Sequence, residues 1–241
     1  MTPKWARWIL AGISVLAMMA PSAFARTGLF LVSDWHAYYG NLESLMKQIA
    51  YERDRFYAAN PKGKFVVAMN GDNAGLSAYS HFFRDDGALI YAYYKILARD
   101  PRIELVVGVG NHDAFDLGGP KGNELFWRQT EDLVRAALAV QGPDFRVTNA
   151  NLKLSPALEP LVAPYRDIET PDGKVRFVGF VLDEFFKKCG YDRTSEPRLF
   201  EGITPMDQLV DRVLAEAVAD GVRVLVPMGH DYTARVISIK Q

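Results

Sequence analysis

Apolar and polar positions alternate in blocks along this chain, and the blocks predict strands and helices in turn. Short apolar runs bounded by turn residues predict buried strands at residues 29–32, 65–69, 105–109 and 222–226. Strands that are apolar throughout are typical of a mostly parallel sheet. The pattern therefore predicts an α/β protein.

Between these runs, apolar residues at three-to-four spacing predict helices over residues 40–60, 86–100, 123–140 and 206–219. Thr204 is expected to cap the last helix, with Pro205 at its first position. A short strand is expected at residues 145–151. Residues 165–169 and 175–182 flank Pro171-Asp172-Gly173 and predict a β-hairpin. Residues 183–202 are polar and mixed, and predict no clear element.

Composition narrows the class of protein. At 241 residues the chain suits one substantial domain, and its hydrophobic content of 49% is enough for a real core. The net charge of -1 provides no basic surface, so a nucleic-acid partner is not expected. Cys189 is the only cysteine, which excludes an intramolecular disulfide and a thiolate metal cluster.

Residues 1–25 are expected to be a secretory signal peptide rather than part of the fold. Lys4 and Arg7 form a basic start, an apolar stretch follows over residues 8–20, and Ala23-Phe24-Ala25 supplies a small-x-small cleavage pattern. The alternative is an uncleaved membrane anchor, but the stretch is shorter than the roughly 20 residues that a spanning helix needs. The mature chain is thus expected to be periplasmic or secreted, without a stable membrane anchor.

Residues capable of metal chemistry directly follow four of the predicted strands. They are Asp34-Trp35-His36, Gly71-Asp72, Gly110-Asn111-His112-Asp113 and His230, which follows Pro227-Met228-Gly229. Ligands of an open α/β sheet bind beyond the carboxyl ends of its strands, so these side chains are expected to meet at one edge. Carboxylate, amide and imidazole donors suit a pair of divalent metal ions.

Two metal ions about 3.5–4 Å apart can clamp the attacking and leaving oxygens of a phosphate ester. Asp34 and His36 alternate along one strand, so both can face the first metal. Asp72 is the expected bridge between the metals, and Asn111 and His230 are the expected further ligands of the second. These donors accept Mn, Zn, Fe, Mg or Co without selecting one.

His112 and Asp113 are the predicted catalytic pair. His112 is expected to protonate the leaving oxygen, while the carboxylate of Asp113 orients the ring and holds it protonated. The nucleophile would be a metal-bound hydroxide, because metal binding lowers the pKa of water toward neutrality. The sequence therefore predicts a metal-dependent phosphoric ester hydrolase.

The order of these motifs resembles that of the calcineurin-like metallophosphoesterases, over essentially the whole chain after residue 25. A narrower likeness is to the bacterial 5′-nucleotidase branch, carried by Thr148-Asn149-Ala150-Asn151-Leu152 and the hairpin over residues 165–180. The resemblance implies a β-sandwich of mixed sheets flanked by helices, in αββα layers. It also implies an exported enzyme that hydrolyses a small phosphate ester, a nucleotide above all.

The chain departs from the family pattern in two places. Ala37 follows His36, where the family has Gly, and no Gly-His-x-His follows His230 before Gln241. Residues 26–241 are therefore expected to be a metallophosphoesterase domain whose C-terminal part is missing, with three protein ligands left for each metal. Cyclic diesters, sugar phosphates and thiosulfate-type esters stay open as substrates. A truncated or degenerate relative that binds metal or ligand without catalysis is the alternative function, and the oligomeric state stays open.

Overall fold

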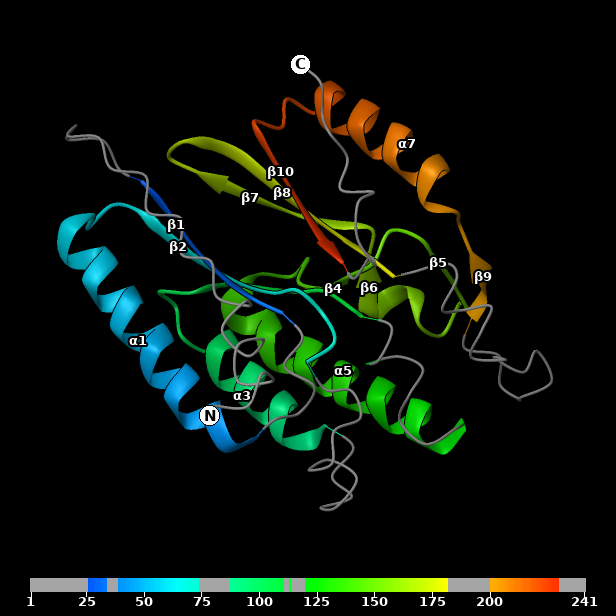
Figure 1. Cartoon of the computed structure of the whole chain (residues 1–241), viewed down its shortest axis with the longest axis horizontal. Coiled ribbons are helices and arrows are strands. Elements are labelled where there is room, and N and C mark those ends of the chain that lie inside the picture. Colours follow the sequence, from blue (N-terminus) through cyan, green and yellow to red (C-terminus); the bar gives the residue numbers. More distant parts are fainter. Residues whose placement is uncertain are drawn as a thin grey trace, which may run out of the picture.

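The computed structural model describes residues 26–33, 39–73, 87–110, 113, 120–181 and 200–229. Strands and helices alternate through these ranges (Figure 1). In chain order the elements are β1 (Thr27–Val32), the 3-10 helix η2 (Tyr39–Asn41), α1 (Leu42–Ala59), β2 (Lys64–Met69), α3 (Ala88–Ala98), β3 (Glu104–Val107), α5 (Pro120–Gln141), β4 (Val147–Thr148), β5 (Leu152–Leu154), the 3-10 helix η3 (Glu159–Leu161), β6 (Val162–Ala163), β7 (Tyr165–Thr170), β8 (Gly173–Phe180), β9 (Phe200–Ile203), α7 (Met206–Ala219) and β10 (Val224–Gly229).

Three parallel strands form the first sheet, in the order β1-β2-β3. Val67 of the central strand pairs with Phe30 on one side and Leu105 on the other. Val66 and Val67 are both fully buried, which explains the unbroken apolar run of β2. Because the strands are parallel and in register, their carboxyl ends share one edge of the sheet.

A second sheet has the order β10-β8-β7, with β8 parallel to β10 and antiparallel to β7. The β7–β8 hairpin turns at Asp172, whose Oδ2 accepts hydrogen bonds from the backbone N (2.8 Å) and Oγ1 (2.9 Å) of Thr27. Within the described ranges β10 pairs only with β8, so it is an edge strand there. That position accommodates Pro227, since the outer side of an edge strand needs no N–H for a ladder.

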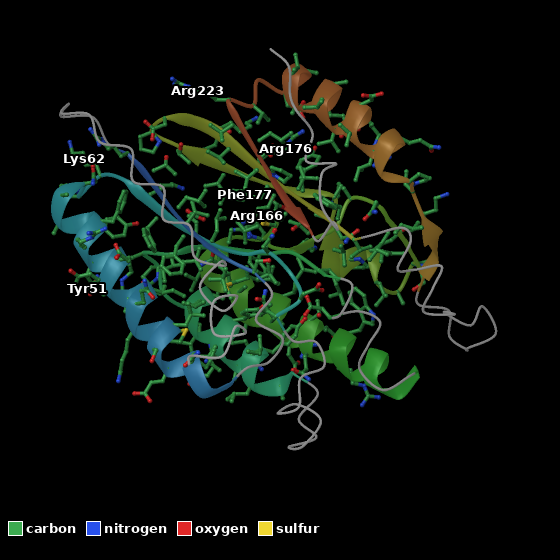
Figure 2. All side chains as sticks on the ribbon, in the orientation of Figure 1. Tyr51, Lys62, Arg166, Arg176, Phe177 and Arg223 are labelled. Atoms are coloured by element: carbon green, nitrogen blue, oxygen red, sulfur yellow. The ribbon has the colours of Figure 1, made fainter. Side chains whose placement is uncertain are left out.

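The two sheets stack face to face between helices, which gives four layers (Figure 1). Phe30, Val67 and Leu105 face one core cluster with α1, α3 and α5, whereas Val66 faces another with Phe177 of β8, labelled in Figure 2. The far face of the second sheet packs against α7. The predicted αββα architecture is therefore confirmed. None of the described helices is both long and apolar enough to cross a bilayer.

A buried ion pair fastens α7 to the second sheet. Arg176 of β8, labelled in Figure 2, has 1% of its side chain exposed. Its Nε and Nη2 donate to the two carboxylate oxygens of Asp167 at 2.7 and 2.8 Å, and Nη2 also donates to Asp220, the C-cap of α7, at 2.7 Å. The guanidinium lies 3.6 Å from the ring centroid of Tyr165. Hydrogen bonding to Asp167, more than any other contact, raises the pKa of Arg176.

Short strands connect the two sheets. A bridge between Gly108 and Thr148 extends the first sheet from β3 to β4, which pairs with β6. The backbone N of Ala150 donates to the carbonyl of Gly179 at 2.7 Å, so the segment after β4 also reaches β8. The antiparallel pair of β5 and β9 follows at this side of the molecule.

Several predicted boundaries are wrong. The last strand covers β10 rather than residues 222–226, because Pro227 does not end an edge strand. The strand expected at residues 145–151 is reduced to β4, and buried hydrogen-bonded asparagines follow it. Pro205, not Thr204, is the N-cap of α7, and no side-chain hydrogen bond caps this helix. The backbone N of Thr204 donates instead to the carbonyl of Asn151, 2.7 Å away.

Candidate functional site

The predicted site residues fall into two groups. Asp72 and Asp113 are among the described residues, and the structure brings them into direct contact. The remaining predicted ligands and the predicted proton donor lie outside the described residues: Asp34, His36, Asn111, His112 and His230. For these five residues, the structure describes only the chain that leads to them, which ends at Ser33, Gly110 and Gly229.

Asp72 lies just beyond β2 in a sharply turned segment. Its side chain is fully buried, its φ is +52°, and the preceding Gly71 has a φ of +90°. The left-handed conformation is unfavourable for a residue with a Cβ, by roughly 1 kcal/mol or more. Surrounding contacts must therefore hold the carboxylate of Asp72 where it is.

The side chain of Asp113 supplies one of these contacts. Its Oδ2 accepts hydrogen bonds from the backbone N of Asp72 at 2.8 Å and from the backbone N of Gly110 at 3.0 Å. Asp113 is itself 4% exposed. One carboxylate oxygen thus joins its own loop to a residue that lies 41 positions earlier in the sequence. The two loops are those after β3 and after β2.

Close packing of the same loops explains the glycine at position 110. A Cβ at Gly110 would collide with the backbone N and the carboxylate Oδ1 of Asp72, and would lie 2.8 Å from its Cγ. A Cβ at Gly71 would lie 2.7 Å from the backbone N of Gly110. The glycines of the two motifs are therefore required by the approach of one loop to the other.

Two further contacts extend the junction to the ends of β1 and β10. Asn70 donates from its backbone N to the carbonyl of Val32 at 2.6 Å and from Nδ2 to Oγ of Ser33 at 3.3 Å. On the other side, the Cε of Met228 in β10 lies 3.4 Å from the Cβ position of Gly108. Ser33 directly precedes Asp34, and Met228 is two residues before His230. The ends of β1, β2 and β3 therefore lie together at one edge of the first sheet, and β10 approaches them from the second sheet rather than from the same sheet, as the sequence had suggested.

The sequence analysis used Asn149 and Asn151 only for the family likeness and did not predict their structural role at this edge. Oδ1 of Asn149 accepts from the backbone N of Asn151 (3.1 Å) and of Leu152 (2.9 Å), while its Nδ2 donates to the carbonyl of Val109 (3.3 Å). Asn151 binds both backbone groups of Val181, at 2.7 and 2.9 Å. The available signal was two asparagines inside an apolar segment, where buried amides must find hydrogen-bond partners.

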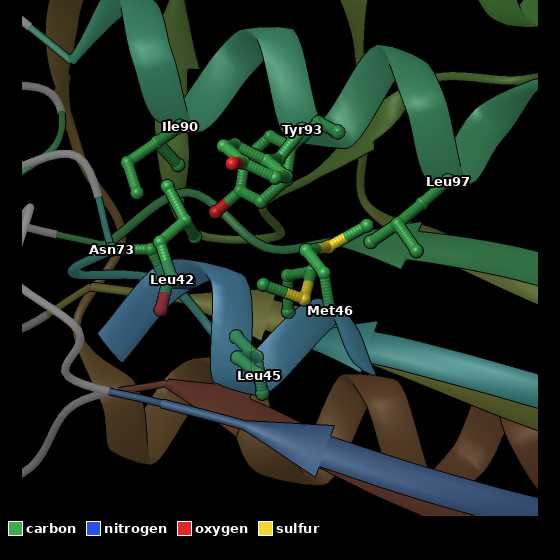
Figure 3. A pocket seen from close by; sticks show the side chains of 9 residues that line it. Leu42, Leu45, Met46, Asn73, Ile90, Tyr93 and Leu97 are labelled. Carbon is green, nitrogen blue, oxygen red and sulfur yellow. The ribbon is translucent and has the colours of Figure 1, made fainter. Parts of the chain in front are cut away.

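Helices α1 and α3 pack next to the loop that carries Asp72. Asn73, the residue after Asp72, lines a small cavity between these helices, with Met46 and Leu97 among its walls (Figure 3). The cavity is otherwise lined by apolar and aromatic side chains. The loop that carries Asp72 is therefore backed by packed side chains rather than by open solvent.

Two buried tyrosines of α3 lie close to Asp113. Burial raises the pKa of both Tyr91 and Tyr94 well above the usual value, and the negative charge of Asp113 raises it further. For Tyr91 a hydrogen bond with Thr130, at 2.9 Å between the hydroxyl oxygens, acts in the opposite direction. Both phenols therefore stay neutral next to Asp113 at physiological pH.

Among the described residues, one side chain is suited to bind a divalent metal ion. The described residues contain no group of three or more His, Cys, Asp or Glu side chains that could hold a metal. They do contain Asp72, a carboxylate fixed at the junction of the strand ends, and carboxylate oxygens suit hard divalent cations. The predicted partners of Asp72 are sequence neighbours of residues that the structure places at this junction.

Comparison with known proteins identifies the fold. No protein-family model and no curated protein matches this sequence. Among solved structures, the NAD nucleotidase of Haemophilus influenzae matches with a TM-score of 0.55 and 13% identity, over 84% of this chain and 34% of that one. The calcineurin-like phosphoesterase YfkN of Bacillus subtilis matches with a TM-score of 0.49 and 18% identity, over 86% of this chain and 62% of that one.

A 5′-nucleotidase precursor from Thermus thermophilus matches with a TM-score of 0.49 and 20% identity, over 76% of this chain and 30% of that one. The likeness at a TM-score of 0.55 shows that the two chains share a fold. The present chain spans about a third of the two nucleotidases, so their complete activities do not transfer with the fold.

Proposed function

We propose that this chain, which has the fold of the metallophosphoesterase superfamily, hydrolyses phosphate esters with two divalent metal ions. The observation that carries the proposal is the junction of the Asp72 and Gly110 loops through Asp113. This junction holds the buried Asp72 next to the ends of β1 and β3 and near Met228 of β10, and the further predicted ligands follow these three strands in sequence.

Each metal would have its own ligand set. Asp34, His36 and Asp72 would hold one ion, and Asp72, Asn111 and His230 the other. When bound, the two ions would supply Lewis-acid activation of water and neutralise charge on the phosphate. The protein's part is to hold the ligands at a fixed separation before any metal arrives.

His112 would act on the leaving group. It is adjacent to the proposed ligand Asn111, and an imidazole there can donate a proton to the leaving oxygen. The proposed substrate is a nucleotide, supported by the fold shared with the NAD nucleotidase and by the resemblance of residues 148–152 to the 5′-nucleotidase branch.

We also propose export, with cleavage after Ala25. The chain would then start at Arg26, whose carbonyl accepts a hydrogen bond from the backbone N of Lys64 at 3.0 Å. Thr27 is bonded to Asp172 at the other side. Cleavage at this point would therefore leave β1 with all of its described contacts. Residues 26–241 would belong to one metallophosphoesterase domain.

The function is tested by hydrolysis assays on the chain from Arg26, with Mn²⁺ or Zn²⁺ added. p-Nitrophenyl phosphate, bis-p-nitrophenyl phosphate and AMP serve as the monoester, diester and nucleotide substrates. Asp72→Asn removes the proposed bridging carboxylate, and Asp172→Asn makes the same chemical change at the opposite end of the strands. Turnover that needs metal, survives Asp172→Asn and is lost in Asp72→Asn supports the proposal.

Two results of these assays would contradict the proposal. A folded parent protein that binds metal or AMP without hydrolysing any of the three esters would support the non-catalytic alternative. Equal activity in the parent and in Asp72→Asn would place the hydrolytic site elsewhere.

A further inference from the structure

The carboxylate of Asp113 lies between the two loops that carry proposed metal ligands. Its Oδ2 accepts hydrogen bonds from two backbone N–H groups, one in the Asp72 loop at 2.8 Å and one in the Gly110 loop at 3.0 Å. Hydrogen bonds from N–H groups to a carboxylate are roughly twice as strong as those to a neutral acceptor. With 4% of the residue exposed, water does not compete for them effectively.

The loops need such a connection because their conformations oppose close approach. Asp72 has a φ of +52°, which a residue with a side chain rarely adopts. Its carboxylate also lies against Gly110 so closely that no Cβ fits there. Without an acceptor shared by both backbones, the strained turn could relax and the loops could separate.

We propose that Asp113 is a positioning residue, which holds the Asp72 and Gly110 loops at a fixed separation and thereby sets the distance between the proposed ligands Asp72 and Asn111. The expected effect on metal binding rests on the proposed function. The positioning role of the Asp113 carboxylate goes beyond the predicted orientation of His112, because Oδ2 accepts hydrogen bonds from the backbone N–H groups of two loops.

Substitution distinguishes the two roles. In Asp113→Asn the amide oxygen can still accept both N–H groups, but the negative charge is lost. In Asp113→Ala the acceptor itself is lost. Positioning by hydrogen bonds predicts that Mn²⁺ affinity falls about 10–100-fold in Asp113→Ala, the usual effect of removing a residue that supports metal ligands, and falls much less in Asp113→Asn. Asp113→Asn should also keep the parental shape of the pH–rate profile.

The matched control is Asp172→Ala. Asp172 also uses one oxygen, Oδ2, to accept two hydrogen bonds at 2.8 and 2.9 Å, but it lies at the hairpin turn away from the strand carboxyl ends. Its loss should leave the dissociation constant for Mn²⁺ unchanged. Titration of each protein with Mn²⁺, followed by calorimetry, measures this constant without reference to turnover.

Amide hydrogen exchange of the metal-free protein tests the positioning directly. In the parent, the amides of Asp72 and Gly110 should be protected. In Asp113→Ala both should exchange at least about tenfold faster while the amide of Val67 keeps its protection, since only the loops open. If Asp113→Ala does not fold, Asp113→Asn still decides, because the proposal requires its two loop amides to stay protected and its Mn²⁺ affinity to stay near the parental value.

Two results would overturn the proposal. One is unchanged exchange of both amides in Asp113→Ala. The other is a loss of Mn²⁺ affinity in Asp113→Asn as large as in Asp113→Ala, which would mean that charge rather than the acceptor matters. Failure of the proposed function looks different: the parent would show protected loop amides yet neither bind Mn²⁺ nor hydrolyse esters.

Discussion

Replacing Gly110 by alanine should separate the two loops of the candidate site. The new Cβ would meet the backbone N and the carboxylate of Asp72, neither of which is the end of a flexible side chain. Forcing atoms into a packed site costs about 1–3 kcal/mol. Parting the loops would also sacrifice the hydrogen bond from Gly110 to Asp113, worth about 1.5–3 kcal/mol for a charged acceptor. We therefore expect the free energy of unfolding to fall by about 3–5 kcal/mol.

Gly108 provides the matched control, because it lies two residues earlier beyond the same strand. A Cβ there would meet nothing closer than the Cε of Met228 at 3.4 Å, an ordinary contact. Gly108→Ala should change stability little or raise it by about 0.4–1 kcal/mol, since alanine restricts the unfolded chain. Urea unfolding of both metal-free variants measures the difference. Values for the two variants within about 0.5 kcal/mol of each other would refute the close contact between Gly110 and Asp72.

Three further predictions concern residues outside the proposed ligands. Tyr91 and Tyr94 have raised pKa values in the folded state, so their contribution to stability is complete below pH 10 and is lost as the pH rises further, by about 1.4 kcal/mol per pH unit for each phenol. The variant with both tyrosines replaced by Phe should therefore lose less unfolding free energy than the parent between pH 10 and 11. An unchanged pH dependence would contradict this. Arg176→Met should lower the free energy of unfolding by about 2–3 kcal/mol, because it removes the charged hydrogen bonds of a buried guanidinium. The control Arg102→Met should lower it by less than about 1 kcal/mol, because the side chain of Arg102 is 52% exposed. Asn151→Asp keeps an acceptor for one backbone N–H but sets an oxygen against a carbonyl, so thermal or urea unfolding should show a loss of about 1–3 kcal/mol, and parental stability would argue against the bidentate contact.

The sequence predicted the main elements well because their apolar periodicity is strong. The helices over residues 40–60 and 206–219 correspond to α1 and α7, and the buried run at residues 65–69 corresponds to β2. The predicted ends of elements were wrong where the place of a strand in the sheet outweighs the conformational preference of its residues. Pro227 lies inside β10 because the outer side of that strand has no ladder partner among the described residues, and this is invisible before the strand order is known.

For the candidate site, the sequence predicted which loops lie together but not the contacts that support them. The loops after β2 and β3 meet because these strands are parallel neighbours, whereas the place of β10 in the second sheet was not predicted. The acceptor role of Asp113 was not predictable, because its partners are backbone N–H groups, one of them in a loop 41 residues earlier. The same holds for Asn149 and Asn151, whose partners Val109 and Val181 lie 40 and 30 residues away.

The central claim is that the strand ends assemble a two-metal site around Asp72, and anomalous diffraction tests it most directly. Crystals of the chain from Arg26 grown with Mn²⁺ should show two anomalous peaks about 3.5–4 Å apart, both bonded to the Asp72 carboxylate. Crystals of Asp72→Asn should lose at least one of the two. Fully formed crystals without a peak at Asp72, or with Mn²⁺ bound only elsewhere, would contradict the account.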